Sequence, residues 1–116
     1  MANPLKFYRK NTCTILLDVC DYQFHDGDTI YFTVKTHPDS DTTDEDALIK
    51  ANWVYGTDVE PDENGTLQLI LTATETNIDY GDYFYDLKLV TAEDPSSEST
   101  LVTGDFTIMD VATLRV

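Results

Sequence analysis

The sequence predicts an all-β fold, an antiparallel β-sandwich of about seven strands in a single domain over residues 1–116. Three observations predict it. Apolar and polar residues alternate with a period of two in several short segments, which is typical of strands with one buried face. Turn-forming residues separate these segments at intervals of about ten to fifteen residues. A chain of 116 residues also fits one domain with a core, and no internal repeat or linker indicates a second.

A short edge strand is predicted over residues 5–9, followed by five segments with clear alternation and one weaker segment. The residues predicted to face the core are Cys13, Ile15, Leu17 and Val19; Ile30, Phe32 and Val34; Leu67, Leu69 and Leu71; Tyr83, Tyr85, Leu87 and Leu89; and Val102, Phe106 and Ile108. The weaker segment, "ALIKANWV", could be read as a helix, but its neighbours are strands and its end is rich in β-forming residues. Gly104, inside the last segment, indicates a β-bulge or a close approach of another backbone.

Turn chemistry marks the breaks between the strands. "HDGD" holds Gly27, and "DENG" ends in Asn64-Gly65, which is a strong turn signal. "HPDSDTTDED" and "EDPSSES" are typical of polar loops. Together with the strands, these turns give the size and strand number of an immunoglobulin-like β-sandwich.

The connection into the strand around Tyr83 carries two local signals. "TATE" fits a capping box, with Thr72 as the N-cap and Glu75 three residues later, so a single helical turn is predicted over residues 73–77. In an immunoglobulin-like fold Tyr83 would bond back to nearby backbone as a tyrosine corner.

The composition is strongly acidic, with 22 Asp plus Glu against 7 Lys plus Arg and a formal net charge of -15. This charge repels phosphate backbones and anionic lipid, so neither nucleic acid nor a membrane surface is an expected partner. Three basic residues, Lys6, Arg9 and Lys10, lie in the first ten positions and could mark a docking edge. No apolar run is long enough for a membrane span or a signal peptide. The protein is therefore expected in a reducing compartment, unless it leaves inside a larger assembly.

The residues that could carry chemistry form no recognisable catalytic site, and no cofactor is expected. Cys13 and Cys20 lie seven positions apart, so on one strand they would point to opposite faces and could not bridge each other. His25 and His37 are predicted at the surface and complete neither a catalytic triad nor a usual zinc spacing. The sequence therefore predicts that the protein is not an enzyme.

The acidic loop "HPDSDTTDED" is the one candidate for a metal site. Asp39, Asp41 and Asp44 begin like an oxygen-only calcium loop. An EF-hand would need Gly at the sixth position and Glu at the twelfth, where this sequence has Asp44 and Lys50. We interpret the segment as a solvated acidic loop, with adventitious calcium binding as the alternative.

Residues 72–113 resemble the C-terminal half of phage-encoded immunoglobulin-like modules, which show a Thr-rich turn, a Gly-x-Tyr-x-Tyr-Asp strand, a polar hairpin and a closing Gly-x-Phe strand. The matching residues are Gly81, Tyr83, Tyr85, Asp86, Leu87, Leu89, Leu101, Gly104, Phe106 and Ile108. Upstream, "GDTIYFTVK" resembles an early strand of the same modules. Such modules occur as the N-terminal domain of the baseplate upper protein in phages of Gram-positive hosts, and as small virion or prophage proteins.

The resemblance implies a non-enzymatic structural protein of a phage or prophage particle that acts through protein–protein contacts. Its partners would be other phage structural proteins, or further copies of itself in a homo-oligomer. It would be made in the host cytoplasm and then enter the virion.

Two surfaces are predicted to carry such contacts. One is the N-terminal segment "PLKFYRK", because aromatic residues and Arg are enriched at interface anchors and its basic side chains would attract an acidic partner. The alternative for this segment is that Leu5 and Phe7 simply pack an edge strand onto the sandwich. The other surface surrounds Phe84, a large apolar residue on an otherwise polar side of its strand. The predicted contact residues are Lys6, Phe7, Tyr8, Arg9 and Phe84.

A carbohydrate- or cell-surface-binding module is the alternative function. Trp53 and Tyr55 would supply a platform for sugar rings, and the acidic loops would supply calcium ligands. Packing in the core and between strands explains the same aromatic residues. The missing secretion signal favours the structural protein.

Overall fold

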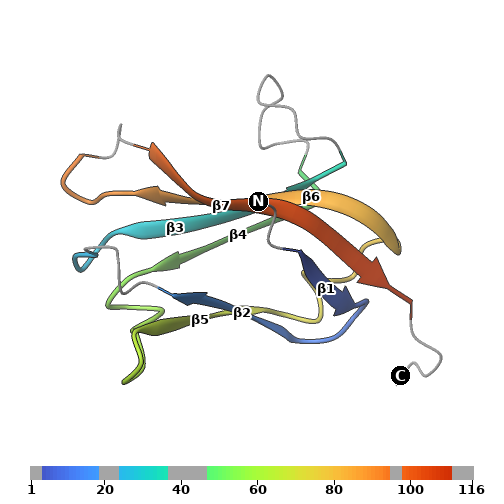
Figure 1. The fold of residues 1–116 in the computed structure, drawn as a ribbon, viewed down its shortest axis with the longest axis horizontal. Coiled ribbons are helices and arrows are strands. Elements are labelled where there is room, and N and C mark those ends of the chain that lie inside the picture. Colours follow the sequence, from blue (N-terminus) through green and yellow to red (C-terminus); the bar gives the residue numbers. More distant parts are fainter. Residues whose placement is uncertain (1–3, 19–23, 37–46, 95–97, 111–116) are drawn as a thin grey trace.

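The computed structural model describes residues 4–18, 24–36, 47–94 and 98–110, and these residues form two sheets without any helix (Figure 1). The strands are β1 (Leu5–Tyr8), β2 (Cys13–Asp18), β3 (Thr29–Lys35), β4 (Ile49–Val54), β5 (Thr66–Leu71), β6 (Gly81–Val90) and β7 (Glu98–Met109). The predicted all-β fold with about seven strands is confirmed, and "ALIKANWV" does contain a strand, β4.

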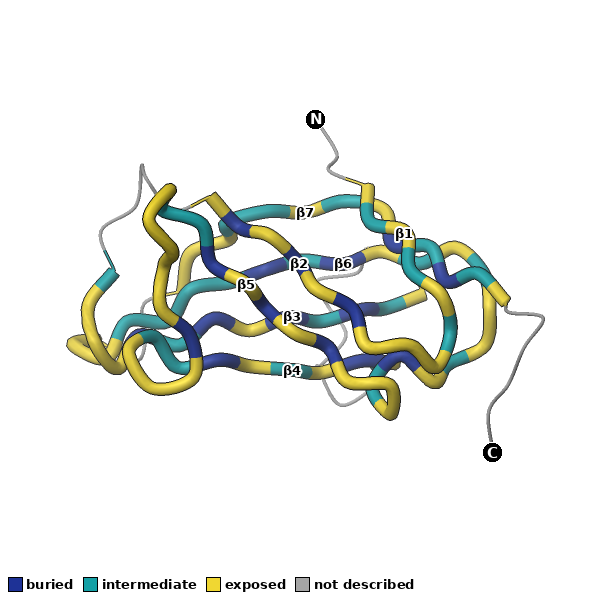
Figure 2. The backbone as a smooth tube through the Cα atoms, turned by 90° about the horizontal axis from the view of Figure 1, so that it is seen from below, coloured by how far each residue is buried: buried dark blue, intermediate teal, exposed yellow. Residues whose placement is uncertain are grey.

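The strand order places the fold among immunoglobulin-like sandwiches. The larger sheet runs β1-β7-β6-β3-β4 and the smaller sheet contains β2 and β5. In immunoglobulin lettering, β7-β6-β3-β4 corresponds to G-F-C-C′ and β2-β5 to B-E. All pairings are antiparallel as predicted, except that β1 runs parallel to β7, with Leu5 opposite Phe106. Figure 2 shows the two-stranded sheet crossing diagonally over the five-stranded sheet.

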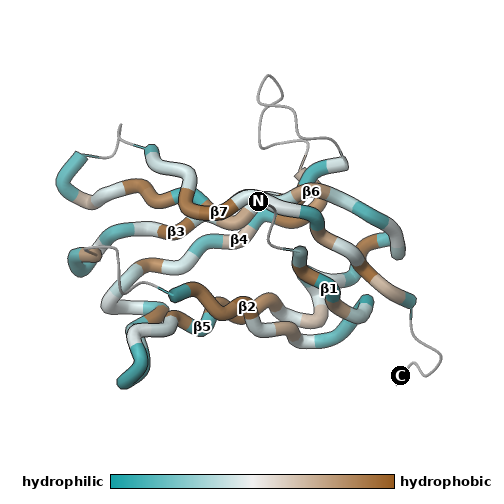
Figure 3. The backbone as a smooth tube through the Cα atoms, viewed as in Figure 1, coloured by the Kyte–Doolittle hydropathy of each residue, from teal (hydrophilic) through white to brown (hydrophobic). Residues whose placement is uncertain are grey.

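The core lies between the two sheets and follows from the period-two pattern. The buried apolar residues are Cys13, Ile15, Leu17, Ile30, Phe32, Val34, Ile49, Trp53, Val59, Leu67, Leu69, Leu71, Tyr85, Leu87, Phe106 and Ile108. Of the residues predicted to face inward, Tyr83, Leu89 and Val102 are only half-buried, and Val19 lies outside the described residues. Apolar segments of both layers supply this core (Figure 3). The alternation therefore predicted the inward side of β2, β3, β5, β6 and β7 correctly.

Strand β7 contains a β-bulge, but at another position than Gly104, where one was predicted. Leu87 pairs with Val102, whereas the next residue, Lys88, pairs with Thr100. Leu101 is therefore the extra residue, and Gly104 lies in regular register opposite Tyr85. A glycine lowers the strand propensity of its segment, but it does not determine where the register between two strands shifts.

The turn between β5 and β6 has the predicted capping box. The Thr72 amide donates to the Glu75 carboxylate at 2.9 Å, and the Glu75 amide donates to the Thr72 hydroxyl at 3.1 Å. The Thr76 amide then donates to the Thr72 carbonyl at 3.1 Å, which closes one helical turn.

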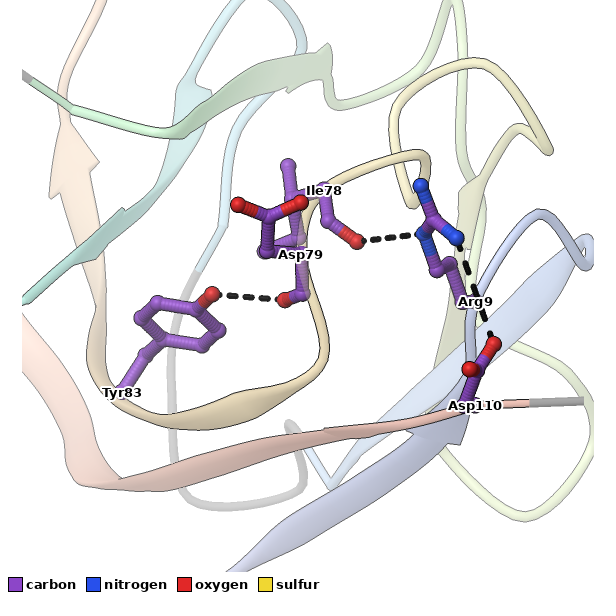
Figure 4. Close-up of polar contacts among 5 residues, drawn as sticks. All are labelled: Arg9, Ile78, Asp79, Tyr83 and Asp110. Carbon is purple, nitrogen blue, oxygen red and sulfur yellow. Dashed lines mark hydrogen bonds and ion pairs between the residues drawn. The ribbon is translucent and has the colours of Figure 1, made fainter.

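Tyr83 forms the predicted tyrosine corner. Its hydroxyl donates to the Asp79 carbonyl oxygen at 2.6 Å, so the start of β6 is tied to the loop that precedes it (Figure 4). Burial raises the pKa of this phenol, and the nearby Asp79 carboxylate adds to the increase. The hydroxyl therefore stays protonated and remains a donor at neutral pH.

The Tyr83→Phe variant should lose about 1 kcal/mol of unfolding free energy, because it removes one hydrogen bond without changing the ring. Urea denaturation of both proteins measures the difference. The matched control is Tyr80→Phe, since Tyr80 lies three positions earlier and its side chain is exposed. Equal effects of the two changes would mean that the corner does not stabilise the fold.

Candidate interaction surface

Side chains with metal-binding chemistry do not converge in the described part of the chain. No group of three or more His, Cys, Asp or Glu there is placed to hold a metal ion. His25 is exposed, as predicted. Cys13 is buried, and burial raises the pKa of its thiol, while the backbone hydrogen bond at Tyr8 opposes that shift. Cys20, His37 and the predicted calcium loop over residues 39–46 lie outside the described residues.

The aromatic residues considered for sugar binding belong to the interior. Trp53 is buried, with its ring centroid 6.4 Å from that of Phe32. Tyr55 is half-buried and stacks on Phe24, with ring centroids 5.3 Å apart and planes inclined by 12°. Core packing therefore accounts for both rings, and Trp53 presents no open face to a ligand.

The predicted contact residues of the N-terminal segment do not all point the same way. Phe7 packs inward, with its ring edge-to-face on Phe106 at 5.8 Å between centroids. Lys6 and Tyr8 alternate with it and are exposed. On its inward side, β1 therefore packs Leu5 and Phe7 onto the sandwich, as the alternative predicted. On its outward side, Lys6 and Tyr8 remain accessible to a partner.

Arg9 ties β1 to two other parts of the chain instead of pointing into solvent (Figure 4). Its side-chain Nε donates to the Ile78 carbonyl at 3.0 Å, and its backbone amide donates to the Met109 carbonyl at 2.9 Å. One guanidinium nitrogen lies 3.9 Å from the Asp110 carboxylate. Beside it, the buried Thr76 hydroxyl donates to the Asn11 carbonyl at 2.7 Å. These bonds give Arg9 a structural role in holding the turn before β6.

The outward face of the five-stranded sheet brings the remaining predicted contact residues together. Phe84 is 36% exposed on β6, and its pairing partners are Lys35 on β3 and Asp105 on β7. We call this outward surface the lysine face. Its charged and aromatic members are Lys6, Tyr8, Tyr31, Lys35, Lys50, Asp82, Phe84, Asp86, Lys88, Glu98 and Asp105.

Strand pairing distributes these side chains in rows across the sheet. Lys88 lies opposite Tyr31, and Asp86 lies opposite Thr33, which is itself opposite Lys50. At the β1 end the Thr107 hydroxyl donates to the Asp82 carboxylate at 2.9 Å. Lysines and acids thus alternate with rings over the same surface, and the long lysine stems can cover neighbouring apolar groups.

The lysine face differs in charge from the rest of the molecule. It holds four of the seven basic residues and four of the 22 acids, so its formal charge is 4 − 4 = 0. The net charge of -15 therefore falls entirely on the remainder of the chain. An acidic partner therefore meets less electrostatic repulsion at this face than the net charge of the molecule suggests.

Sequence reasoning missed this surface because its lysines lie far apart in the chain, at positions 6, 35, 50 and 88. Each one occupies a polar position in an alternating segment, which was a usable signal. The strand order β1-β7-β6-β3-β4 was also needed to place them together.

The chain matches no known protein family, and a search of curated proteins finds no match. The described residues include no helix that is long and apolar enough to span a membrane.

Proposed function

We propose that the chain is a non-enzymatic structural protein of a phage or prophage particle, and that it binds another particle protein through the lysine face. The observation that carries this proposal is the neutral, lysine- and aromatic-bearing sheet face in a molecule of net charge -15. Aromatic rings are enriched at protein interfaces, and Tyr8, Tyr31 and Phe84 are exposed there.

The charge pattern indicates what kind of surface the partner presents. Lysine ammonium groups can pair with carboxylates that a partner brings, while the acids around the face disfavour other orientations. Charged side chains at an interface mainly determine the orientation of the two proteins and the rate at which they associate. The aromatic rings would therefore supply most of the binding free energy. The expected partner surface is therefore neutral to acidic, with apolar positions opposite Phe84 and Tyr31.

The assignment to a particle rests on the resemblance of residues 72–113 to phage-encoded immunoglobulin-like modules. The residues that carry it are mainly framework residues, since Tyr83 forms the tyrosine corner and Tyr85 and Phe106 are buried. They support the fold, and the lysine face supports a role in binding. The two observations are independent of each other.

Charge reversal on the lysine face should weaken capture of the partner. Lys50→Glu and Lys88→Glu would each be immobilised and exposed to the purified products of neighbouring genes at about 150 mM salt. Each variant should retain at most about a tenth of the capture shown by the wild type, because a charge reversed in a desolvated contact costs well over 1.4 kcal/mol.

The matched control is Lys10→Glu, which makes the same charge change at an exposed lysine outside the face. It should capture the partner as the wild type does. Equal losses in all three variants would show that only net charge matters. A wild type that captures no particle protein and instead binds a cell-wall glycan would support the carbohydrate-binding alternative.

A further inference from the structure

The two-stranded sheet has two open edges, one along β2 and one along β5. In the described part of the chain, β2 and β5 pair only with each other. An open edge presents unpaired amide and carbonyl groups that a strand of another molecule can join. We infer that β2 pairs with β2 of a second copy of this chain, which makes a four-stranded antiparallel sheet across two molecules.

The edge strands of the larger sheet carry protection against such pairing. Strand β1 has only four residues and bears the exposed Lys6. Strand β4 bears the exposed Lys50, and the backbone amide of Val54 at its end donates to the Asp58 carboxylate at 2.8 Å. Short length, outward lysines and capped amides are the devices by which proteins block edge pairing.

Strand β2 has none of these devices and presents an apolar residue to solvent. It contains no Lys, Arg or Pro, and Figure 3 colours most of it as hydrophobic. Leu16, in its centre, is 66% exposed. Ile70 on β5 is also exposed and lies opposite Thr14, next to Leu16 on the same outer face. A second copy of β2 would place its own Leu16 beside this one, and Ile70 would extend the same apolar outer face one strand further from the join.

The residues that face the core limit the register of the pairing, and the side-chain pairs that form then favour an axis at Leu16. Cys13, Ile15 and Leu17 point inward, so a continuous sheet must pair inward residues with inward ones. A two-fold axis at Leu16 satisfies this condition. It places the two Leu16 side chains opposite each other and each Asp18 opposite the Thr14 of the other copy.

The side chains of β2 are self-complementary in this register, which favours a second copy as the occupant. Strands β2 and β5 contain one charged residue between them, Asp18, so two molecules of charge -15 meet along strands that add little repulsion of their own. In this register each Asp18 faces a Thr14 hydroxyl, which can donate to it, and no two acids face each other. The edge of β5 is less suitable, because the connection that leads into it carries four acids: Asp58, Glu60, Asp62 and Glu63.

A cysteine at the two-fold axis tests this pairing directly. Directly opposite residues of antiparallel strands have Cα atoms about 4.5–5.5 Å apart, which a disulfide can bridge. Leu16→Cys should therefore form a disulfide-linked dimer under mild oxidation, and reductant should reverse it. Thr14→Cys is the matched control, because the two Thr14 positions would lie four residues apart along the strands, or about 13 Å.

Both cysteine variants would be made in a Cys20→Ser background, and any bridging by Cys13 would appear in both. A Leu16→Cys protein that stays monomeric would overturn the proposal. Equal cross-linking of Leu16→Cys and Thr14→Cys would overturn it too, since that result indicates random collision.

Sedimentation velocity without cross-linking provides a second readout. From about 10 µM to about 1 mM protein at about 150 mM salt, the wild type should shift toward dimer, as expected for a small interface.

Two variants test whether β2 forms the interface. Leu16→Asp should stay monomeric, whereas Leu48→Asp should dimerise, because Leu48 is 42% exposed but lies outside β2. A dimer that survives Leu16→Asp, or a wild type that is monomeric throughout, would overturn the proposal. Lys50→Glu should dimerise normally, which separates this inference from the lysine face.

Discussion

Replacing Phe32 by alanine should lower the free energy of unfolding by about 3–5 kcal/mol, the range typical of a fully buried Phe. Phe32 is completely buried in β3, where the two sheets meet. Its ring centroid lies 5.7 Å from that of Tyr85, 5.8 Å from that of Phe106 and 6.4 Å from that of Trp53. Alanine would remove the common neighbour of three rings and leave a cavity among residues of β4, β6 and β7.

Urea denaturation followed by Trp53 fluorescence and by circular dichroism measures this loss. The control is Tyr31→Ala, the preceding residue in the same strand, which points outward and is 41% exposed. It should cost less than about 1 kcal/mol, since it changes only strand propensity and surface contacts. Similar losses from both variants would contradict the assignment of the two faces of β3.

Replacing Asp28 by alanine should cost about 2–4 kcal/mol, although the residue is an acid in a turn. Its carboxylate is 2% exposed and accepts two backbone hydrogen bonds, from the His25 amide at 2.9 Å and from the Ala92 amide at 3.0 Å. Hydrogen bonds to charged groups contribute about 1.5–3 kcal/mol, and alanine would leave two amide donors without a partner. Because Ala92 follows β6, the carboxylate joins the turn before β3 to the β6–β7 connection.

Thermal and urea unfolding of Asp28→Ala and Glu93→Ala should separate this role from a general charge effect. Glu93 lies next to Ala92 and is exposed, so removing its carboxylate should change stability by no more than about 0.5 kcal/mol. Asp28→Asn should fall between the two, since its amide nitrogen cannot accept one of the two bonds. If Asp28→Ala were as stable as Glu93→Ala, the buried carboxylate would have no structural role.

The sequence was most informative where one local rule determines the structure. Period-two alternation predicted the buried side of β2, β3, β5, β6 and β7, because a strand with one buried face leaves no freedom in which residues point inward. The capping box of Thr72 and Glu75 and the corner bond of Tyr83 were also predictable, since both connect residues within a few positions of each other.

Features that depend on strand order could not be predicted in this way. The parallel pairing of β1 with β7 joins the two ends of the described chain, and the bulge falls at Leu101 because of the ladder between β6 and β7. Arg9 was predicted as a contact residue from its type, yet its side chain bonds to the Ile78 carbonyl, 69 positions away. The lysine face likewise exists only once the strands are placed side by side.

Cosedimentation with particles tests most directly whether the lysine face attaches this protein to a larger assembly. Cells that carry the gene would produce particles with either the wild type or the Lys50→Glu/Lys88→Glu double variant, and a sucrose gradient would separate particles from free protein. The wild type should migrate with the particles, while the double variant, folded with an unchanged melting temperature, should remain at the top of the gradient. A double variant that migrates with the particles as the wild type does, or a wild type that stays at the top, would contradict the proposed role.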